Sequence, residues 1–285
     1  MSAWLLEESL VGKRDPENGI LEGLDTTILG LEKLAGNLKI NLELMMLDGC
    51  IESAIKTFDA RQPWMAADDL ANGKWLLMML IQKVNAATAQ GGDKNHLLFL
   101  LGNKEAEFND AMNKTLGLAM EVLVDPPPAP SGAMSQFGGP RETFAVAIPG
   151  QKFSITATVV NRSHIKVVPR DLSLPGGNNV FVENGPFYVT SLDYNGRLSH
   201  QFPVTVAETA VYTRPYWSRA SELRDHIYQI NKPEFLHLPF APPDVMGVFT
   251  YAVNGVDFTL TQPAQTVYID RPWGEQRRLL TIAPA

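Results

Sequence analysis

Apolar residues repeat with two different periods along this chain of 285 residues. In the first half they recur at intervals of three and four, which places them on one face of an α-helix. Residues 1–124 are therefore predicted to form an α-helical domain. The clearest apolar stripe consists of Leu44, Leu47, Ile51, Ile55 and Phe58.

Three further helices are expected in this half of the chain. The segment 25–36 offers Asp25 and Thr26 as N-cap residues. A second helix is predicted over residues 63–91, where a proline fits the first turn and a glycine pair follows the last. The third is predicted over residues 97–124. Its apolar stripe consists of Phe108, Ala111, Met112, Leu116, Ala119 and Val122.

The period changes to two after residues 125–142, a stretch rich in proline and glycine that we interpret as a linker. The segment "KFSITATVVN" alternates apolar and polar residues, as a half-buried strand does. Asn254 and Gly255 lie between two such segments and favour the type I′ turn of a β-hairpin.

Strands that follow one another at short intervals, with no long helix between them, indicate an antiparallel β-sandwich. Residues 143–285 are therefore predicted to form an Ig-like β-sandwich. The segment "SRASELRDHIYQI" departs from the pattern because it favours a helix. We expect it to form a short helical insertion near residues 218–230.

Charge and hydropathy exclude several kinds of partner. The net charge of −7 argues against binding to nucleic acid or to an anionic membrane surface, since both require a basic face. No apolar run approaches the roughly 20 residues of a membrane-spanning helix. The N-terminus lacks the basic leader of a signal peptide. These features leave the compartment of the protein open.

The motifs of common enzyme classes are missing from the sequence. The single cysteine, Cys50, lies in an apolar helical context and is interpreted as an unreactive core thiol. The five histidines do not form a His-x-x-His pair, and neither a Gly-x-Ser-x-Gly elbow nor a phosphate-binding loop is present. We therefore expect no catalytic residue, no metal site and no cofactor in this chain, although distant residues could still converge.

The segment "VYTRPYWSR" and a later tryptophan supply the candidate ligand-binding residues Arg214, Tyr216, Trp217 and Trp273. Exposed aromatic rings offer flat apolar faces to sugars, which favours a carbohydrate-binding module. The same residues also serve as core anchors in β-sandwiches, and we consider that interpretation the stronger one. Pro215 ends strand pairing there and biases Arg214 towards an extended conformation.

Five segments, in order, resemble the region that follows the catalytic domain in large bacterial PIG-L/LmbE-like deacetylases. They are "ILEGLDTTILGL", "IPGQKFSITATVVNRSHIKV", "YTRPYW", "LPFAPPDVMGVFTYAVNGVDFTL" and "RPWGEQRRLLTIAPA". The family's zinc motifs, His-Pro-Asp-Asp and His-x-x-His, are absent, so no catalytic role transfers to any residue here.

The resemblance implies an accessory, non-catalytic region of a zinc-dependent N-deacetylase that acts on amino sugars and related conjugates. Such a region would serve domain packing, assembly or substrate positioning. Its expected partner is an upstream catalytic domain or another subunit. If the parent enzyme carries a leader peptide, the region functions outside the cytoplasm.

Overall fold

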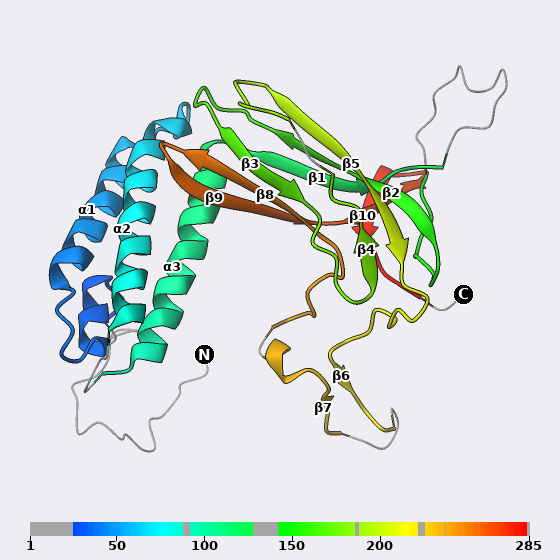
Figure 1. Cartoon of the computed structure of the whole chain (residues 1–285), viewed down its shortest axis with the longest axis horizontal. Helices are drawn as coiled ribbons and strands as arrows, with labels where there is room; N and C mark the ends of the chain where they lie inside the picture. The colour runs from blue at the N-terminus through cyan, green and yellow to red at the C-terminus, as the bar shows by residue number, and fades with distance from the viewer. Residues whose placement is uncertain are drawn as a thin grey trace, which may run out of the picture.

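The computed structural model describes residues 25–87, 92–127, 142–185, 188–221, 226–236 and 238–283. Helices come first and strands follow, so the protein is a mixed α and β structure (Figure 1). None of the described helices is long and apolar enough to cross a lipid bilayer. Most of the predicted linker, residues 128–141, lies outside the described residues.

Three α-helices form a layer at one end of the molecule, with α2 beside both α1 and α3 (Figure 1). Of the stripe predicted for α1, Leu44 and Leu47 are buried, whereas Ile55 and Phe58 are exposed. The helices and the short 3-10 turns between them are η1 (Leu29–Leu34), α1 (Asn41–Thr57), η2 (Pro63–Ala66), α2 (Ala67–Ala86) and α3 (Lys94–Thr115).

The first described turn depends on Asp25 and Thr27, and not on Thr26. Asp25 Oδ1 accepts hydrogen bonds from the Thr27 backbone N–H and hydroxyl, at 3.2 and 2.7 Å. Thr27 Oγ1 in turn accepts from the Gly30 N–H at 3.2 Å. Hydrogen bonds from Lys33 and Thr27 lower the pKa of Asp25 to about 2. The N-cap position of η1 is Ile28, without a side-chain capping bond, so the prediction of Asp25 or Thr26 as the N-cap is wrong.

The last predicted helix ends earlier than expected, at Thr115 instead of residue 124. Gly117 adopts a left-handed conformation with φ of 57°. The Gly117 N–H donates to Lys114 O and the Leu118 N–H donates to Asn113 O, both at 3.0 Å, which is the hydrogen-bond pattern of a Schellman motif. The chain then enters strand β1 (Ala119–Val124), where burial alternates with period two.

The longer strands build two sheets. One has the order β11-β10-β1-β2-β5-β4 and is antiparallel except for the β1–β10 pair; the other has the order β3-β8-β9. The remaining strands of these sheets are β2 (Lys152–Val160), β3 (Val168–Ser173), β4 (Val180–Val182), β5 (Arg197–Val206), β8 (Met246–Val253), β9 (Val256–Pro263), β10 (Gln265–Asp270) and β11 (Gly274–Leu279).

The predicted hairpin at Asn254 and Gly255 is confirmed. Both residues have positive φ, 51° and 80°, and they join β8 to β9 through the pair Val253 and Val256. These are the dihedral angles that a type I′ turn requires at its two central residues.

The predicted helix at residues 218–230 is wrong where the structure describes it. Trp217–Ser218 (β6) pairs antiparallel with Gln229–Ile230 (β7), so the insertion is a two-stranded ribbon. The ribbon projects away from both sheets (Figure 1). Residues 222–225, which connect its strands, lie outside the described residues. Helix propensity was overridden by cross-strand pairing of the apolar Trp217 and Ile230.

The two sheets contact each other through β1 on one side and the hairpin of β8 and β9 on the other. A side chain at Gly247 on β8 would lie only 2.5 Å from Val122 Cγ2 on β1, so the glycine is what allows this close approach. Phe249, Tyr251 and Phe258 are part of the hydrophobic core and lie in one row on the same face of the second sheet as Gly247, with neighbouring ring centroids 5.4 and 5.9 Å apart. Helices and sheets thus contribute to one continuous hydrophobic core.

A buried lysine joins the helical layer to the second sheet. Lys74 on α2 is only 3% exposed. Its ammonium group donates to Asn109 Oδ1 on α3 at 2.8 Å and to the Asp257 carbonyl on β9 at 2.6 Å. The same group lies 4.6 Å from the centre of the Phe258 ring. Burial lowers the pKa of Lys74, although the charges of Glu105 and Asp257 act in the opposite direction.

We expect Lys74→Ala to lower the free energy of unfolding by about 2–4 kcal/mol, since it removes the donor of the partly buried Asp257 carbonyl, leaves Asn109 Oδ1 only its bond from the Thr259 N–H, and opens a cavity. Urea denaturation measures this change. Lys74→Met keeps the stem on the Phe258 ring and should cost less. An alanine variant as stable as the parent protein would contradict this role for the lysine.

A second prediction compares two glycines inside helices. A side chain at Gly73 on α2 would lie 2.7 Å from Phe108 Cε1, whereas nothing lies within 4 Å of one at Gly102 on α3. Gly73→Ala should therefore destabilise the protein by about 1–3 kcal/mol through overpacking. Gly102→Ala should stabilise it by about 0.5–1 kcal/mol through helix propensity. Thermal denaturation of both variants tests the pair, and shifts of the same sign would refute it.

Candidate functional site

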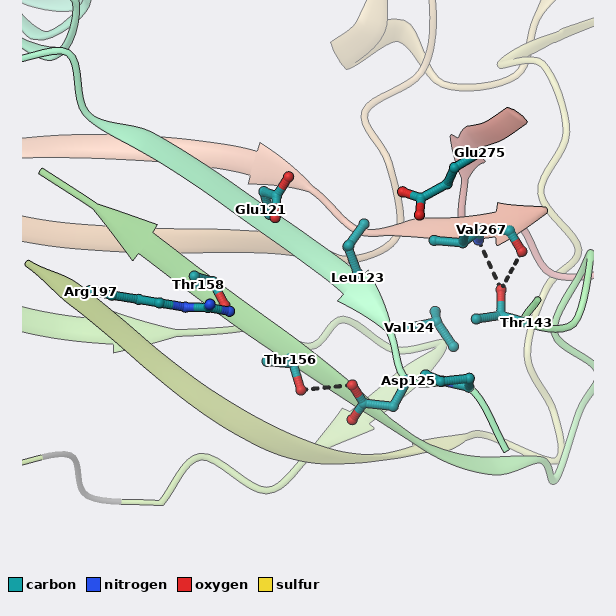
Figure 2. Close-up of a pocket in the computed structure, with 11 residues that line it drawn as sticks. Glu121, Leu123, Val124, Asp125, Thr143, Thr156, Thr158, Arg197, Val267 and Glu275 are labelled. Atoms are coloured by element: carbon teal, nitrogen blue, oxygen red, sulfur yellow. Dashed lines mark hydrogen bonds between the residues drawn. The ribbon is translucent and has the colours of Figure 1, made fainter. Parts of the chain in front are cut away.

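A cavity of about 340 Å³ lies on the face of the six-stranded sheet that points away from the second sheet. Its lining comes from β1, β2, β5, β10 and β11 and from the segments that follow or precede them (Figure 2). The lining residues are Glu121, Leu123, Val124, Asp125, Pro126, Thr143, Thr156, Thr158, Arg197, Val267 and Glu275. None of them was predicted as a site residue.

Strand register brings polar residues of this face together. Glu121 on β1 pairs with Thr158 on β2, and Thr158 pairs with Ser199 on β5. Residues directly opposite each other on paired strands project from the same face of a sheet. The Thr158 and Ser199 hydroxyl oxygens are 2.9 Å apart and hydrogen-bonded. This face is therefore the polar half of the alternating pattern.

Asp125 is the best-anchored carboxylate of the cavity. The Thr156 hydroxyl donates to its Oδ1 and the Gln201 amide donates to its Oδ2, each at 2.7 Å. The Asp125 backbone N–H also donates to Ser154 O at 2.8 Å. Three bonds from two neighbouring strands thus fix the carboxylate and its backbone in one orientation (Figure 2).

Charges of both signs line the other walls. Arg277 Nη1 donates to Glu121 Oε1 at 2.8 Å, and Arg277 Nε lies 3.3 Å from Glu275 Oε1. The hydrogen bond with Glu121 raises the pKa of Arg277. Arg197 is the first residue of β5. It lies near Thr158, at the end of the cavity opposite Thr143 and Val267 (Figure 2). Within the described residues, its guanidinium group makes no hydrogen bond and no ion pair.

The ribbon carries a second, shallow depression lined by Trp217, Tyr228 and Ile230. The Trp217 and Tyr228 rings meet edge to face, with centroids 4.7 Å apart and planes at 81°. Arg219 lies 5.2 Å from the centre of the Tyr228 ring. The Trp217 and Tyr228 rings therefore do not lie in one plane.

The four predicted ligand-binding residues do not converge on one site. The Tyr216 hydroxyl donates to Leu238 O at 2.8 Å, and the Arg214 guanidinium lies 5.9 Å from the Tyr212 ring centre. Trp273 lies at the turn between β10 and β11, in a different sheet, and is 77% exposed. Tyr216 thus fixes the base of the ribbon, but it is only half-buried, and Trp217 and Trp273 are exposed, so the interpretation of these residues as core anchors is wrong.

The helical layer exposes a set of large apolar side chains that we call the apolar face. The ion pair Glu43–Lys83 and the hydrogen bond Thr57–Asp69 align α1 and α2 antiparallel. Helical spacing then places the five side chains of the apolar face on the outer side of the seam between these two helices. The apolar face consists of Leu42, Met45, Met46, Trp75 and Met79, which are 49–68% exposed.

The described residues contain no group of three or more histidine, cysteine or acidic side chains that could hold a metal ion. Cys50 is half-buried between α1 and α2, with its Cβ facing Gly73. Burial, and to a smaller extent the charge of Asp69, raises the pKa of the Cys50 thiol.

Comparison with known proteins identifies no relative by sequence. No family model matches the chain, and no curated protein matches it. A FixG-related protein from Vibrio parahaemolyticus aligns by structure at 10% identity over 57% of this chain and 95% of its own, with a TM-score of 0.23.

A second structural alignment is with the Pseudomonas fluorescens alkylpurine DNA glycosylase AlkC, solved bound to DNA that contains an abasic site analogue. It has 10% identity and a TM-score of 0.19, over 90% of this chain and 64% of that one. Scores this low support no inference about fold or function.

The raised pKa of Cys50 predicts slow alkylation. At pH 8 we expect iodoacetamide to modify Cys50 more slowly in the folded protein than in the urea-unfolded chain, because the thiolate is the reactive form. The rate should still be rising with pH above 9. Asp69→Asn should accelerate it, whereas Asp110→Asn, on the exposed surface of α3, should not. Equal rates in the folded and unfolded chains would contradict the prediction.

Proposed function

We propose that this chain is an accessory, non-catalytic region of a PIG-L/LmbE-like N-deacetylase and that its helical layer binds the catalytic domain. The observation that carries the proposal is the apolar face. Five large side chains stand half exposed on two adjacent helices. Contiguous apolar surface of this kind on a folded domain is typical of a protein-binding site.

The order of the segments supports this choice of partner. The five segments resemble, in order, the region that lies downstream of the catalytic domain in the deacetylase family, which supports that domain as the proposed partner. Any domain joined to the chain ahead of residue 25 would be tethered beside η1, which contacts α1, and α1 carries Leu42, Met45 and Met46 of the apolar face. Methionine-rich surfaces adapt to the shape of a partner, and a tryptophan supplies rigid contact area.

We also infer that the strands form an Ig-like sandwich, with β1 included in it. The two sheets meet at Gly247 and Val122, the pairing is antiparallel apart from one pair, and large aromatic residues fill the space between them. In such a sandwich the outer faces and the connecting loops remain accessible for binding. The sandwich would then hold the helical layer in position against the catalytic domain.

Binding to a separately produced catalytic domain of the family tests the proposal. We expect a complex by size-exclusion chromatography and isothermal titration calorimetry. The double variant Trp75→Ser/Met79→Ser should weaken binding at least tenfold, since central aromatic and methionine residues carry much of such an interface. Light scattering of the chain alone shows whether the same face joins two copies instead.

Ile55→Ser provides the matched control. Ile55 is also on α1 and is 65% exposed, but helical spacing places it away from the apolar face. It should leave the affinity unchanged. The proposal fails if the catalytic domain does not bind, or if Ile55→Ser weakens binding as much as the double variant does.

A further inference from the structure

We propose that the cavity on the outer face of the six-stranded sheet binds a short, hydroxyl-rich carbohydrate. This inference is independent of the partner proposed for the helical layer. It rests on the lining of the cavity and on strand register, and the aromatic residues of the ribbon play no part in it. The cavity, about 340 Å³, is within the range of roughly 300–1,000 Å³ that is usual for small-molecule sites.

The floor of the cavity is apolar and its walls are polar. Leu123 and Val267 lie on adjacent strands, and Val267 is 7% exposed. The walls carry three threonine hydroxyls, three carboxylates and one guanidinium group (Figure 2). A sugar ring has the same division, because its C–H groups form an apolar face while its hydroxyls point outwards. A purely apolar ligand would leave the walls without partners.

The hydrogen-bonding capacity of the walls is partly used and partly free. Each Asp125 carboxylate oxygen accepts one hydrogen bond from a described side chain and retains a further acceptor site. The Thr156 oxygen also retains an acceptor site after its hydroxyl has donated. Glu121 Oε1 is bonded to Arg277, whereas Oε2 has no bond to a described residue. These groups are held in place by their existing bonds and can still accept hydroxyl protons from a ligand.

Arg197 supplies the opposite chemistry at the other end. Its guanidinium group has five N–H donors, and none is bonded within the described part of the chain. A ligand that spans the cavity must therefore donate near Asp125 and accept near Arg197. A hydroxyl does both, so a polyhydroxylated ligand satisfies the two ends together. A polyanion is disfavoured by the three carboxylates.

Asp125 and Arg197, at the two ends of the cavity, differ in their hydrogen bonding to the protein. Substitutions at these two residues therefore test the proposal independently. Asp125→Asn removes the charge that strengthens hydrogen bonds from hydroxyls, and it also weakens the bonds with Thr156 and Gln201. Arg197→Ala removes only a side chain that contacts no described partner through hydrogen bonds, so the fold should be retained. Asp171→Asn, on β3 of the other sheet, is the matched control for loss of a carboxylate.

The experiment titrates the whole chain with cellotriose, the trimer of N-acetylglucosamine and the trimer of glucosamine, with amide NMR shifts as the readout. We expect at least one trisaccharide to shift amides of β1, β2 and β5 saturably. Arg197→Ala and Asp125→Asn should each weaken that binding about tenfold, the loss typical of one hydrogen bond to a charged group. Asp171→Asn and Trp217→Ala should leave it unchanged.

Three results would overturn the proposal. The first is that none of the trisaccharides shifts amides of these strands at concentrations up to those that saturate weak lectin sites. The second is binding that Arg197→Ala leaves intact. The third is binding that Trp217→Ala abolishes, which would place the sugar at the ribbon. The thermal midpoint of each variant shows whether a loss of binding reflects a loss of fold.

Discussion

The arrangement of helices and sheets depends on the ammonium group of Lys74. A buried charge is tolerated only when it is well hydrogen-bonded, so α2, α3 and β9 must stay where Lys74 can reach Asn109 and the Asp257 carbonyl. Asn113, one turn after Asn109 on α3, extends this polar seam. It donates to Thr259 O on β9 and accepts from the Tyr251 hydroxyl. Burial raises the pKa of Tyr251 far above its ordinary value, so this donor keeps its proton.

The same constraint explains why the helical half does not separate from the strands. The end of α3 leads through Gly117 directly into β1, which lies between β10 and β2 in the large sheet. With the polar seam on one side and this direct connection on the other, the helical layer is attached at two places. Among the described residues, the apolar face, the outer face of the large sheet and the ribbon are left uncovered. Each of these surfaces is accessible for binding.

Local patterns in the sequence were sufficient for several elements and insufficient for the site. Asn254 and Gly255 dictate their turn through φ alone, and the helical stripe around Leu44 follows from its period. The prediction that the last helix extends to residue 124 was wrong, because the six residues of β1 fit the period of a helix as well as that of a strand. Only Gly117 marks the boundary between the two elements. The cavity could not be predicted, since it joins residues from five strands through register. Nothing local relates Arg197 to Asp125, which are 72 residues apart in sequence.

The outer face of the large sheet and the apolar face of the helices differ in which residues occupy their outward positions. This difference separates the roles that we propose for them. On β1 and β2 the outward positions hold Glu121, Thr156 and Thr158, the polar half of a period of two, so this face is stable in water without a cover. On α1 and α2 the outward positions hold methionine and tryptophan where polar residues are expected. Such a violation is kept only where another surface repays the exposure. We therefore expect the sheet face to bind a small, soluble ligand reversibly, and the helical face to form a lasting contact with a protein surface.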